Sequence, residues 1–164
     1  MIIEPYASHD RSAFDCGHPD LNTYAARHLG QYERNRLAKH WVAVEQPNGP
    51  ITGFYAISQH ALDTQSLPHR IRKRLPRHPV PCSLLGRLAV DRRHQGRHLG
   101  EILLFHAFST VLRASREIGT FALIVDAVDD NAANFYTRYG LVPLEHNPLR
   151  LMILTQTLLQ HMTA

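Results

Sequence analysis

A basic loop that contains glycine is the part of this sequence best suited to bind an anion. It follows the apolar run Leu84–Val90 and leads into residues that recur at helical spacing from Leu99 onward. The first backbone N–H groups of a helix have no partner within it, and the helix dipole adds partial positive charge there. Arg92, Arg93 and Arg97 reinforce that charge. The pattern is compatible with an anion site, but taken alone it is a weak signal, because glycines in such a loop often serve simply to turn the chain.

This loop and a second segment downstream resemble the two motifs of the GNAT acetyltransferase family. Gln95–Gly100 is similar to the pyrophosphate-binding motif Q/R-x-x-G-x-G/A, except that His98 stands where the family has glycine. Asn131–Leu141 is similar to the closing N-x-x-x-x-F/Y helix, which ends at a glycine. An aromatic pair on a helix is by itself typical of core packing. The order and separation of the two segments favour the family interpretation instead.

The resemblance implies acetyl-CoA as the cofactor and assigns a role to particular residues. Tyr136 would protonate the departing CoA thiolate as general acid. A backbone N–H in the strand would polarise the acetyl carbonyl, an interaction worth about 3 kcal/mol. His98 could still donate its backbone N–H if its side chain turned outward. The implied cofactor-binding residues are Leu88, Ala89, Val90, Gln95, Gly96, Arg97, His98, Leu99, Gly100, Asn131 and Phe135.

Other segments narrow the resemblance to the GNAT toxins of bacterial toxin–antitoxin pairs. They are Phe14–Gly17 with Leu21-Asn22, Leu85–Asp91, and Pro143-Leu144 leading into Leu149–Leu151. These toxins acetylate the α-amine of aminoacyl-tRNA and so block translation. They pair with small antitoxins that carry a ribbon-helix-helix DNA-binding half. The resemblance therefore implies aminoacyl-tRNA and such an antitoxin as partners, and it leaves a homodimer open.

The apolar run also bears on the acceptor. Leu84–Val90 contains no Asp or Glu, so no strong base faces the substrate from it. A lysine amine, with a pKa near about 10.4, needs a base far more than an α-amine near about 7.7–8.0. The sequence therefore favours an α-amine, but it does not separate aminoacyl-tRNA from a peptide N-terminus or a small amine.

The charge distribution suggests a polyanionic partner. The formal net charge is +4, and most of the 18 Lys and Arg fall in 27–39, 70–77 and 87–97. Those stretches contain only two acids, Glu33 and Asp91. One such stretch is usually a solvated face, but three in a chain of this size favour polyanion binding. The predicted tRNA-binding residues are Arg27, Arg34, Arg36, Lys39, Arg70, Arg72, Lys73, Arg74, Arg92 and Arg93.

Metal and disulfide chemistry are not indicated. The 12 histidines show no HxH, HExxH or Cys/His ligand spacing, so we predict no metal site. Cys16 and Cys82 are expected to be reduced structural thiols of a cytoplasmic protein.

The elements that position these residues follow from the hydrophobic pattern and predict an α/β (α+β) fold with a mixed central sheet flanked by helices. We expect a helix over 21–39 that begins at an Asp20 cap and is interrupted at Gly30, and a long helix over 99–117 closed by Gly119. A further helix is expected over 132–139. The expected strands are 2–4, 41–44, 51–58, 84–90, 121–125 and 151–158, with a short basic helix over 67–75.

Length and composition fit one domain spanning residues 1–164, with 44% hydrophobic residues and no run long enough to span a bilayer. Two rival functions remain open. One is a GNAT enzyme acting on a small amine, an antibiotic or a protein N-terminus, although the lack of acidic clusters disfavours a polycationic antibiotic. The other is an inert module that holds CoA or an antitoxin, which His98 in the glycine position favours.

Overall fold

The computed structural model describes residues 1–162, and the chain divides into two compact units. Unit 1 contains Met1–Ser58 and Arg87–Ala107, and unit 2 contains Gln59–Gly86 and the chain from Phe108 onward. The division between the units falls inside three elements, so each of these contributes residues to both units. They are β3 (Ile51–Leu62), β4 (Val80–Val90) and α4 (Leu99–Ala114). No helix in the described part of the chain is long and apolar enough to cross a bilayer.

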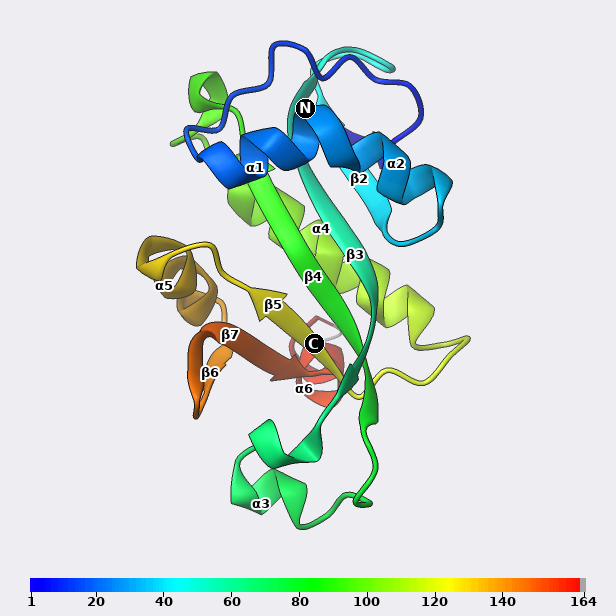
Figure 1. Ribbon diagram of the computed structural model, residues 1–164, viewed down its shortest axis with the longest axis vertical. Coiled ribbons are helices and arrows are strands. Elements are labelled where there is room, and N and C mark those ends of the chain that lie inside the picture. The colour runs from blue at the N-terminus through cyan, green and yellow to red at the C-terminus, as the bar shows by residue number, and fades with distance from the viewer. Residues whose placement is uncertain (163–164) are drawn as a thin grey trace. The chain divides into compact units, whose positions relative to one another are not determined.

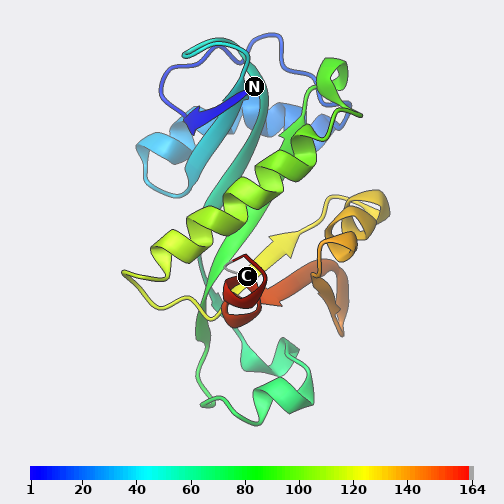
Figure 2. The ribbon, with the colours of Figure 1, turned by 180° about the vertical axis from the view of Figure 1, so that it is seen from behind.

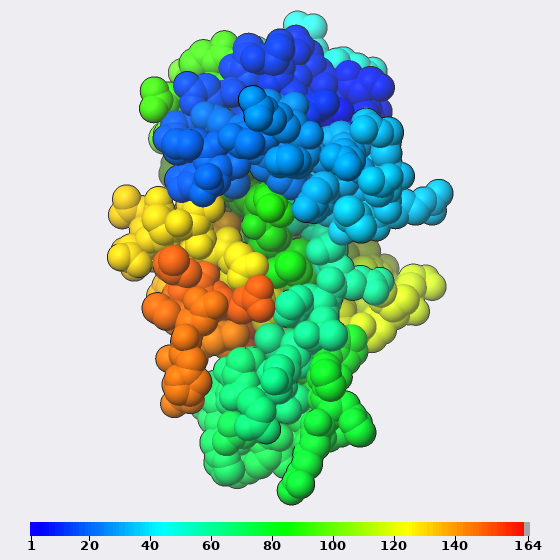
Figure 3. Space-filling model, in the orientation of Figure 1, coloured from blue at the N-terminus to red at the C-terminus, as the bar shows by residue number. Residues whose placement is uncertain are grey.

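In unit 1 a sheet lies between two helical layers. Its other strands are β1 (Ile2–Pro5) and β2 (Lys39–Val44), and the strand order is β1-β2-β3-β4 with antiparallel β1–β2 and β2–β3 pairs. One face carries α1 (Pro19–Thr23), the π-helical turn η1 (Tyr24–His28) and α2 (Leu29–Arg34). Figure 1 shows these segments in front of the strands, and Figure 2 shows α4 on the opposite face. In Figure 3 the N-terminal segments, in blue, form the upper part of the surface in view.

The alternation of side chains along β3 explains these two layers. Phe54 and Ala56 are buried with Tyr24 and Leu29 of the N-terminal helical segments. Gly53 points the other way, where an added Cβ would lie 3.0 Å from a Leu103 methyl of α4. Glycine at this position therefore lets α4 pack closely on the sheet.

Unit 2 is built on the parallel β4–β5 pair and an antiparallel extension. Its further elements are η2 (Thr64–Ser66), α3 (His69–Arg72), β5 (Ala122–Asp126), α5 (Asp130–Arg138), β6 (Val142–Leu144), β7 (Asn147–Leu154) and α6 (Thr155–Met162). The strand order is β4-β5-β7-β6, with both β7 pairs antiparallel. The buried residues of one face, among them Cys82, Ile124 and Met152, pack with Leu67. Cys82 is a free thiol, as is Cys16 in unit 1.

Several boundaries differ from the sequence-based prediction. The first helical segment ends at Arg34, because Arg36 adopts a left-handed φ of 59° that a helix cannot continue. Asp20 lies inside α1, whose N-cap is His18. Gly30 lies within α2, and the irregularity is instead the π turn, in which the Leu29 N–H bonds to Tyr24 O.

The C-terminal part was also mispredicted. The expected strand over 151–158 ends at Leu154, and α6 follows; a short apolar run cannot be assigned to strand or helix by periodicity alone. The hairpin strand β6 was not predicted. The helix α4 ends at Ala114, so Gly119 does not cap it.

Candidate functional site

The predicted anion-binding loop is held in unit 1 by the N-terminal segment. After β4, Arg92–His94 form the short 3-10 helix η3. The Arg92 N–H donates to Asp15 O at 2.8 Å, and the Asp91 N–H donates to Thr52 O at 2.8 Å. Gly17, with a φ of 86°, lies against Arg92, and an added Cβ would approach Arg92 Nε to 2.9 Å. The toxin-like segment 14–17 thus fixes the position of the loop.

A buried carboxylate organises this junction. Asp91 is 1% exposed, and its oxygens accept hydrogen bonds from the Asp15 N–H (3.1 Å), the Arg93 N–H (2.9 Å) and the Arg93 side chain (2.9 and 3.2 Å). Burial alone would raise the pKa of Asp91, but the hydrogen bonds from Arg93 and the Asp15 backbone outweigh it and lower the pKa to about 2. Asp91 is therefore ionised at neutral pH and acts as a structural anchor. Sequence reasoning did not single it out.

The side chain of Gln95 is committed to the protein. Its Nε2 donates to Val90 O at 2.8 Å and to Cys16 O at 3.0 Å, which ties the end of β4 to the N-terminal segment. Cys16 is further positioned by Asn22, whose Oδ1 accepts the Cys16 N–H at 2.9 Å. The side chain of the first residue of the predicted motif therefore shapes the loop, and its backbone N–H is also engaged, donating to Arg92 O at 3.4 Å.

The loop enters α4 through two residues in left-handed conformations, Gly96 (φ 78°) and His98 (φ 65°). The Ile102 N–H bonds to His98 O at 3.0 Å, so the N–H groups of Leu99, Gly100 and Glu101 precede the first intrahelical bond. The His98 side chain is 82% exposed, and its Nδ1 lies 3.2 Å from Glu101 Oε2. Its imidazole thus turns outward, which leaves a backbone cradle suited to pyrophosphate.

We expect His98→Gly to stabilise the protein and to keep its affinity for acetyl-CoA or raise it. A left-handed conformation costs a residue with a Cβ about 1–2 kcal/mol, and the greater freedom of glycine in the unfolded chain offsets part of that gain. The free energy of unfolding in urea should rise by about 0.5–1 kcal/mol. Asn48→Gly is the matched control, because Asn48 has a φ of 62° in a turn elsewhere. Weaker acetyl-CoA binding by folded His98→Gly would instead assign a phosphate contact to the imidazole.

The predicted proton donor lies in unit 2. Asp129 caps α5, with its Oδ1 accepting the Ala132 N–H at 2.9 Å. Tyr136 is 4% exposed and packs edge-to-face against Phe135, with ring centroids 5.2 Å apart. Burial raises the pKa of Tyr136 above its usual value, so the hydroxyl stays protonated at neutral pH. Asn131 is exposed in the first turn of the same helix.

The predicted tRNA-binding residues differ in how free their charges are. Arg93 is bonded to Asp91, and Arg92 Nε lies 4.0 Å from Asp15 Oδ1. Lys39 Nζ lies 3.8 Å from Glu33. The remaining seven have no carboxylate within ion-pairing distance in the described chain: Arg27, Arg34, Arg36, Arg70, Arg72, Lys73 and Arg74. All of these but Arg72 are exposed.

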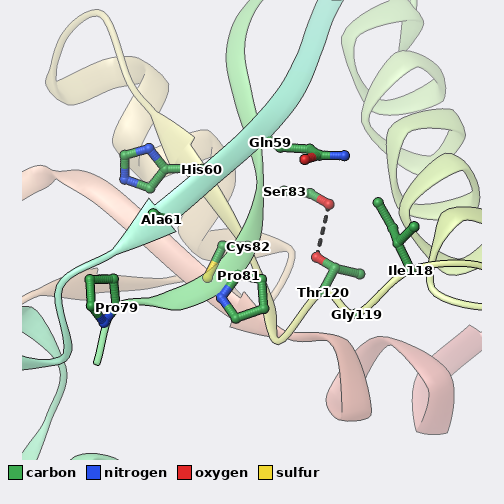
Figure 4. Close-up of a pocket in the computed structure, with 10 residues that line it drawn as sticks. All are labelled: Gln59, His60, Ala61, Pro79, Pro81, Cys82, Ser83, Ile118, Gly119 and Thr120. Atoms are coloured by element: carbon green, nitrogen blue, oxygen red, sulfur yellow. Dashed lines mark hydrogen bonds between the residues drawn. The ribbon is translucent and has the colours of Figure 1, made fainter. Parts of the chain in front are cut away.

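Unit 2 also has a pocket of about 350 Å³ that contains none of the predicted site residues. Figure 4 shows it at β3, β4 and the turn before β5, where Ser83 Oγ and Thr120 Oγ1 share a hydrogen bond of 2.9 Å. His60, at its wall, contacts Arg150, which forms two hydrogen bonds to Asp126 at 2.7 and 3.0 Å. In residues 1–162 no group of three or more His, Cys, Asp and Glu could hold a metal ion. Burial raises the pKa of the Cys82 thiol at this pocket to about 11, so the thiol is protonated at neutral pH.

Known proteins resemble this chain over most of its length. The family model described as the acetyltransferase (GNAT) domain matches residues 36–142. A tRNA-acetylating toxin of Mycobacterium tuberculosis is 35% identical over 150 residues, which cover 88% of this chain and 86% of the relative.

Two solved structures extend the likeness to the fold. AtaT complexed with acetyl-methionyl-tRNAfMet superposes with a TM-score of 0.89 at 30% identity, covering 99% of both chains. A mutant AtaT toxin bound to the C-terminus of the antitoxin AtaR and acetyl-CoA gives a TM-score of 0.86 at 28% identity, covering 99% of this chain and 98% of that one. The predicted fold class, a mixed sheet flanked by helices, is confirmed.

Proposed function

Because the chain belongs to the GNAT acetyltransferase family, we propose that it transfers the acetyl group of acetyl-CoA to the α-amine of aminoacyl-tRNA. The observation that carries this function is the 35% identity to a tRNA-acetylating toxin over 88% of the chain. The AtaT complex with acetyl-methionyl-tRNAfMet supports the same acceptor class. Acetylation of the α-amine prevents its use in peptide bond formation, so the activity is that of a toxin that blocks translation.

The residues in unit 1 fit the phosphates of acetyl-CoA. The left-handed Gly96 and the N–H groups of Leu99 and Gly100 form a backbone cradle at the positive end of α4. No side chain fills the space beside Gly96, where an added Cβ would meet nothing within 4 Å. The exposed Arg97 adds positive charge at this cradle.

The proposed chemistry is direct transfer without a covalent enzyme intermediate. When bound, acetyl-CoA supplies an activated acetyl group as a thioester. Backbone groups of Leu88, Ala89 and Val90 at the end of β4 bind the pantetheine arm, and an N–H there polarises the carbonyl. Attack by the neutral α-amine would form the amide C–N bond as the thioester C–S bond breaks, and the amine proton would pass to water. Tyr136 would donate its hydroxyl proton to the leaving thiolate, since its raised pKa keeps the hydroxyl protonated. The strand Val80–Val90 carries no acid, so a weakly basic α-amine suits the site better than lysine.

Further parts of the proposal concern partners and organisation. The antitoxin AtaR is bound by the AtaT toxin, and we propose an antitoxin with a ribbon-helix-helix half as the partner of this chain. We also propose that both units belong to one acetyltransferase domain, since β3, β4 and α4 each continue from one unit into the other. The proposed location is the cytoplasm, where charged tRNA is found.

Labelling an acceptor tests this function. The protein would be incubated with radiolabelled acetyl-CoA and a pool of charged tRNA, and the label would be located after nuclease and mild base treatment. We expect acetylated amino acids released from tRNA. Label found only on small amines or on protein N-termini would establish the rival enzymes, and absence of saturable acetyl-CoA binding would establish an inert module.

A further inference from the structure

A half-buried arginine on β4 has no anionic partner within residues 1–162. Arg87 lies in unit 1, directly before Leu88–Val90. Among the described residues its guanidinium makes no ion pair and no hydrogen bond. It presents five N–H donors in one plane, and partial removal of such a cation from water without a counter-charge is costly. This arginine did not enter the predicted tRNA-binding set.

Aromatic rings hold the cation in place. Arg87 Cζ lies 3.9 Å from the centroid of the Tyr24 ring and 6.0 Å from that of Tyr32. A cation over a ring face is stabilised by about 0.5–2 kcal/mol, but the ring supplies no acceptor for the in-plane N–H groups. The contact therefore orients the guanidinium and leaves its hydrogen-bonding capacity unused.

The ring beneath the arginine is rigidly supported. The Tyr24 hydroxyl shares a hydrogen bond with His40 Nε2. Its ring stacks on Phe54 with centroids 6.0 Å apart, and Tyr32 meets it edge-on at 5.5 Å. Tyr24 opens the π-helical turn η1, and such turns are frequent at functional sites. The platform is thus built from the helical segment and two strands of unit 1.

Nearby groups that could neutralise the cation are otherwise engaged. Burial raises the pKa of Tyr24 to about 12 although Arg87 opposes the shift, so the phenol is neutral at physiological pH. Glu33 Oε1 accepts the His40 N–H at 3.0 Å, and its other oxygen lies 3.8 Å from Lys39 Nζ. The positive charge of Arg87 is therefore available to a ligand.

We propose that Arg87, held over Tyr24 beside Tyr32, binds a phosphodiester of the acceptor, namely the last internucleotide phosphate at its 3′ end. This inference rests on the proposed function. A guanidinium fork matches phosphate geometry. In aminoacyl-tRNA the amino acid is esterified to the terminal ribose, so this phosphate is the one nearest the reacting amine. The helical segment that carries both tyrosines also carries the exposed Arg27 and Arg34, which suit the neighbouring phosphates.

A double-mutant cycle, with one change in the protein and the other in the substrate, tests this site. Wild-type and Arg87→Gln proteins would be compared on aminoacyl-tRNA and on the same tRNA carrying a neutral methylphosphonate at that phosphate. We expect each change alone to lower kcat/KM about tenfold, mainly through KM, and the second change to add little once the first is made. Arg87→Lys keeps the charge without the fork and should fall between the two proteins. Arg116→Gln, an exposed arginine in unit 2, is the control and should behave as wild type.

The outcomes separate this site from other roles. Independent, multiplicative losses, or no loss in either Arg87 variant, would overturn the phosphate site. Weaker binding of acetyl-CoA itself, measured by calorimetry, would assign the arginine to the phosphates of CoA and overturn it as well. If the wild-type protein does not acetylate unmodified aminoacyl-tRNA, the proposed function fails and this inference falls with it.

Discussion

Replacing Tyr136 by phenylalanine is expected to slow acetyl transfer about a hundredfold while leaving acetyl-CoA affinity almost unchanged. Loss of a general acid typically costs two to four orders of magnitude, and a hundredfold corresponds to about 2.7 kcal/mol in the barrier. The phenylalanine ring can keep the edge-to-face contact with Phe135, so packing of α5 should persist. Single-turnover transfer to aminoacyl-tRNA measures the rate, and calorimetric titration measures acetyl-CoA binding.

Tyr139→Phe is the matched control for this experiment. Tyr139 directly follows α5, and its ring also lies 5.2 Å from Phe135. Both variants lose one hydroxyl next to the same aromatic neighbour, so only a specific role for Tyr136 separates their rates. Near-normal turnover by Tyr136→Phe, or an equal loss in both variants, would remove Tyr136 from the proposed mechanism.

Periodicity predicted the strands and the long helix well, because those segments carry strong apolar patterns. The predicted helix over 99–117 contains α4, and the predicted strand over 84–90 is the C-terminal part of β4. It failed where local backbone geometry decides, as in the π turn at Tyr24–His28 and the helix end before Arg36. It failed again over 151–158, where apolar residues fit either β7 or α6.

For the candidate site, the sequence identified the binding loop but not the contacts that hold it in place. Motif resemblance identified the loop Gln95–Gly100, and the left-handed φ of His98 explains why the family has glycine there. It did not reveal that Gln95 is bonded to Cys16 and Val90, nor that buried Asp91 anchors the loop. The contacts of Asp91 with Asp15 and of Gln95 with Cys16 join residues more than 70 positions apart, and no local pattern encodes them. The sequence did contain one indication of these contacts, because the segment 14–17 and the loop both belong to the toxin-like family pattern.

Salt dependence and charge reversal on α3 together test the acceptor. Leu67, Ile71 and Leu75 pack towards the core of unit 2, so the exposed Arg70 and Lys73 project from a fixed segment. Binding of an acceptor with many phosphates releases counterions, and log affinity should fall with log salt by about 0.7–0.9 per phosphate contacted. A free amino acid ester carries no phosphate and should be a poor substrate with little salt dependence.

Arg70→Glu and Lys73→Glu should each weaken binding of aminoacyl-tRNA and reduce the salt slope by about 1, with acetyl-CoA affinity unchanged. The physical reason is loss of a phosphate contact, since neither residue has a carboxylate partner in the described chain. Arg116→Glu, which makes the same change in charge at an exposed turn residue after α4, separates local contact from overall charge. Binding to non-hydrolysable aminoacyl-tRNA would be titrated between about 50 and 200 mM salt, a range over which such contacts have a large effect.

If Arg116→Glu weakens binding as much as Arg70→Glu does, the effect belongs to net charge and α3 is not the tRNA-binding surface. If the ester and aminoacyl-tRNA are acetylated with equal efficiency, the phosphates contribute nothing, and the acceptor is a small amine.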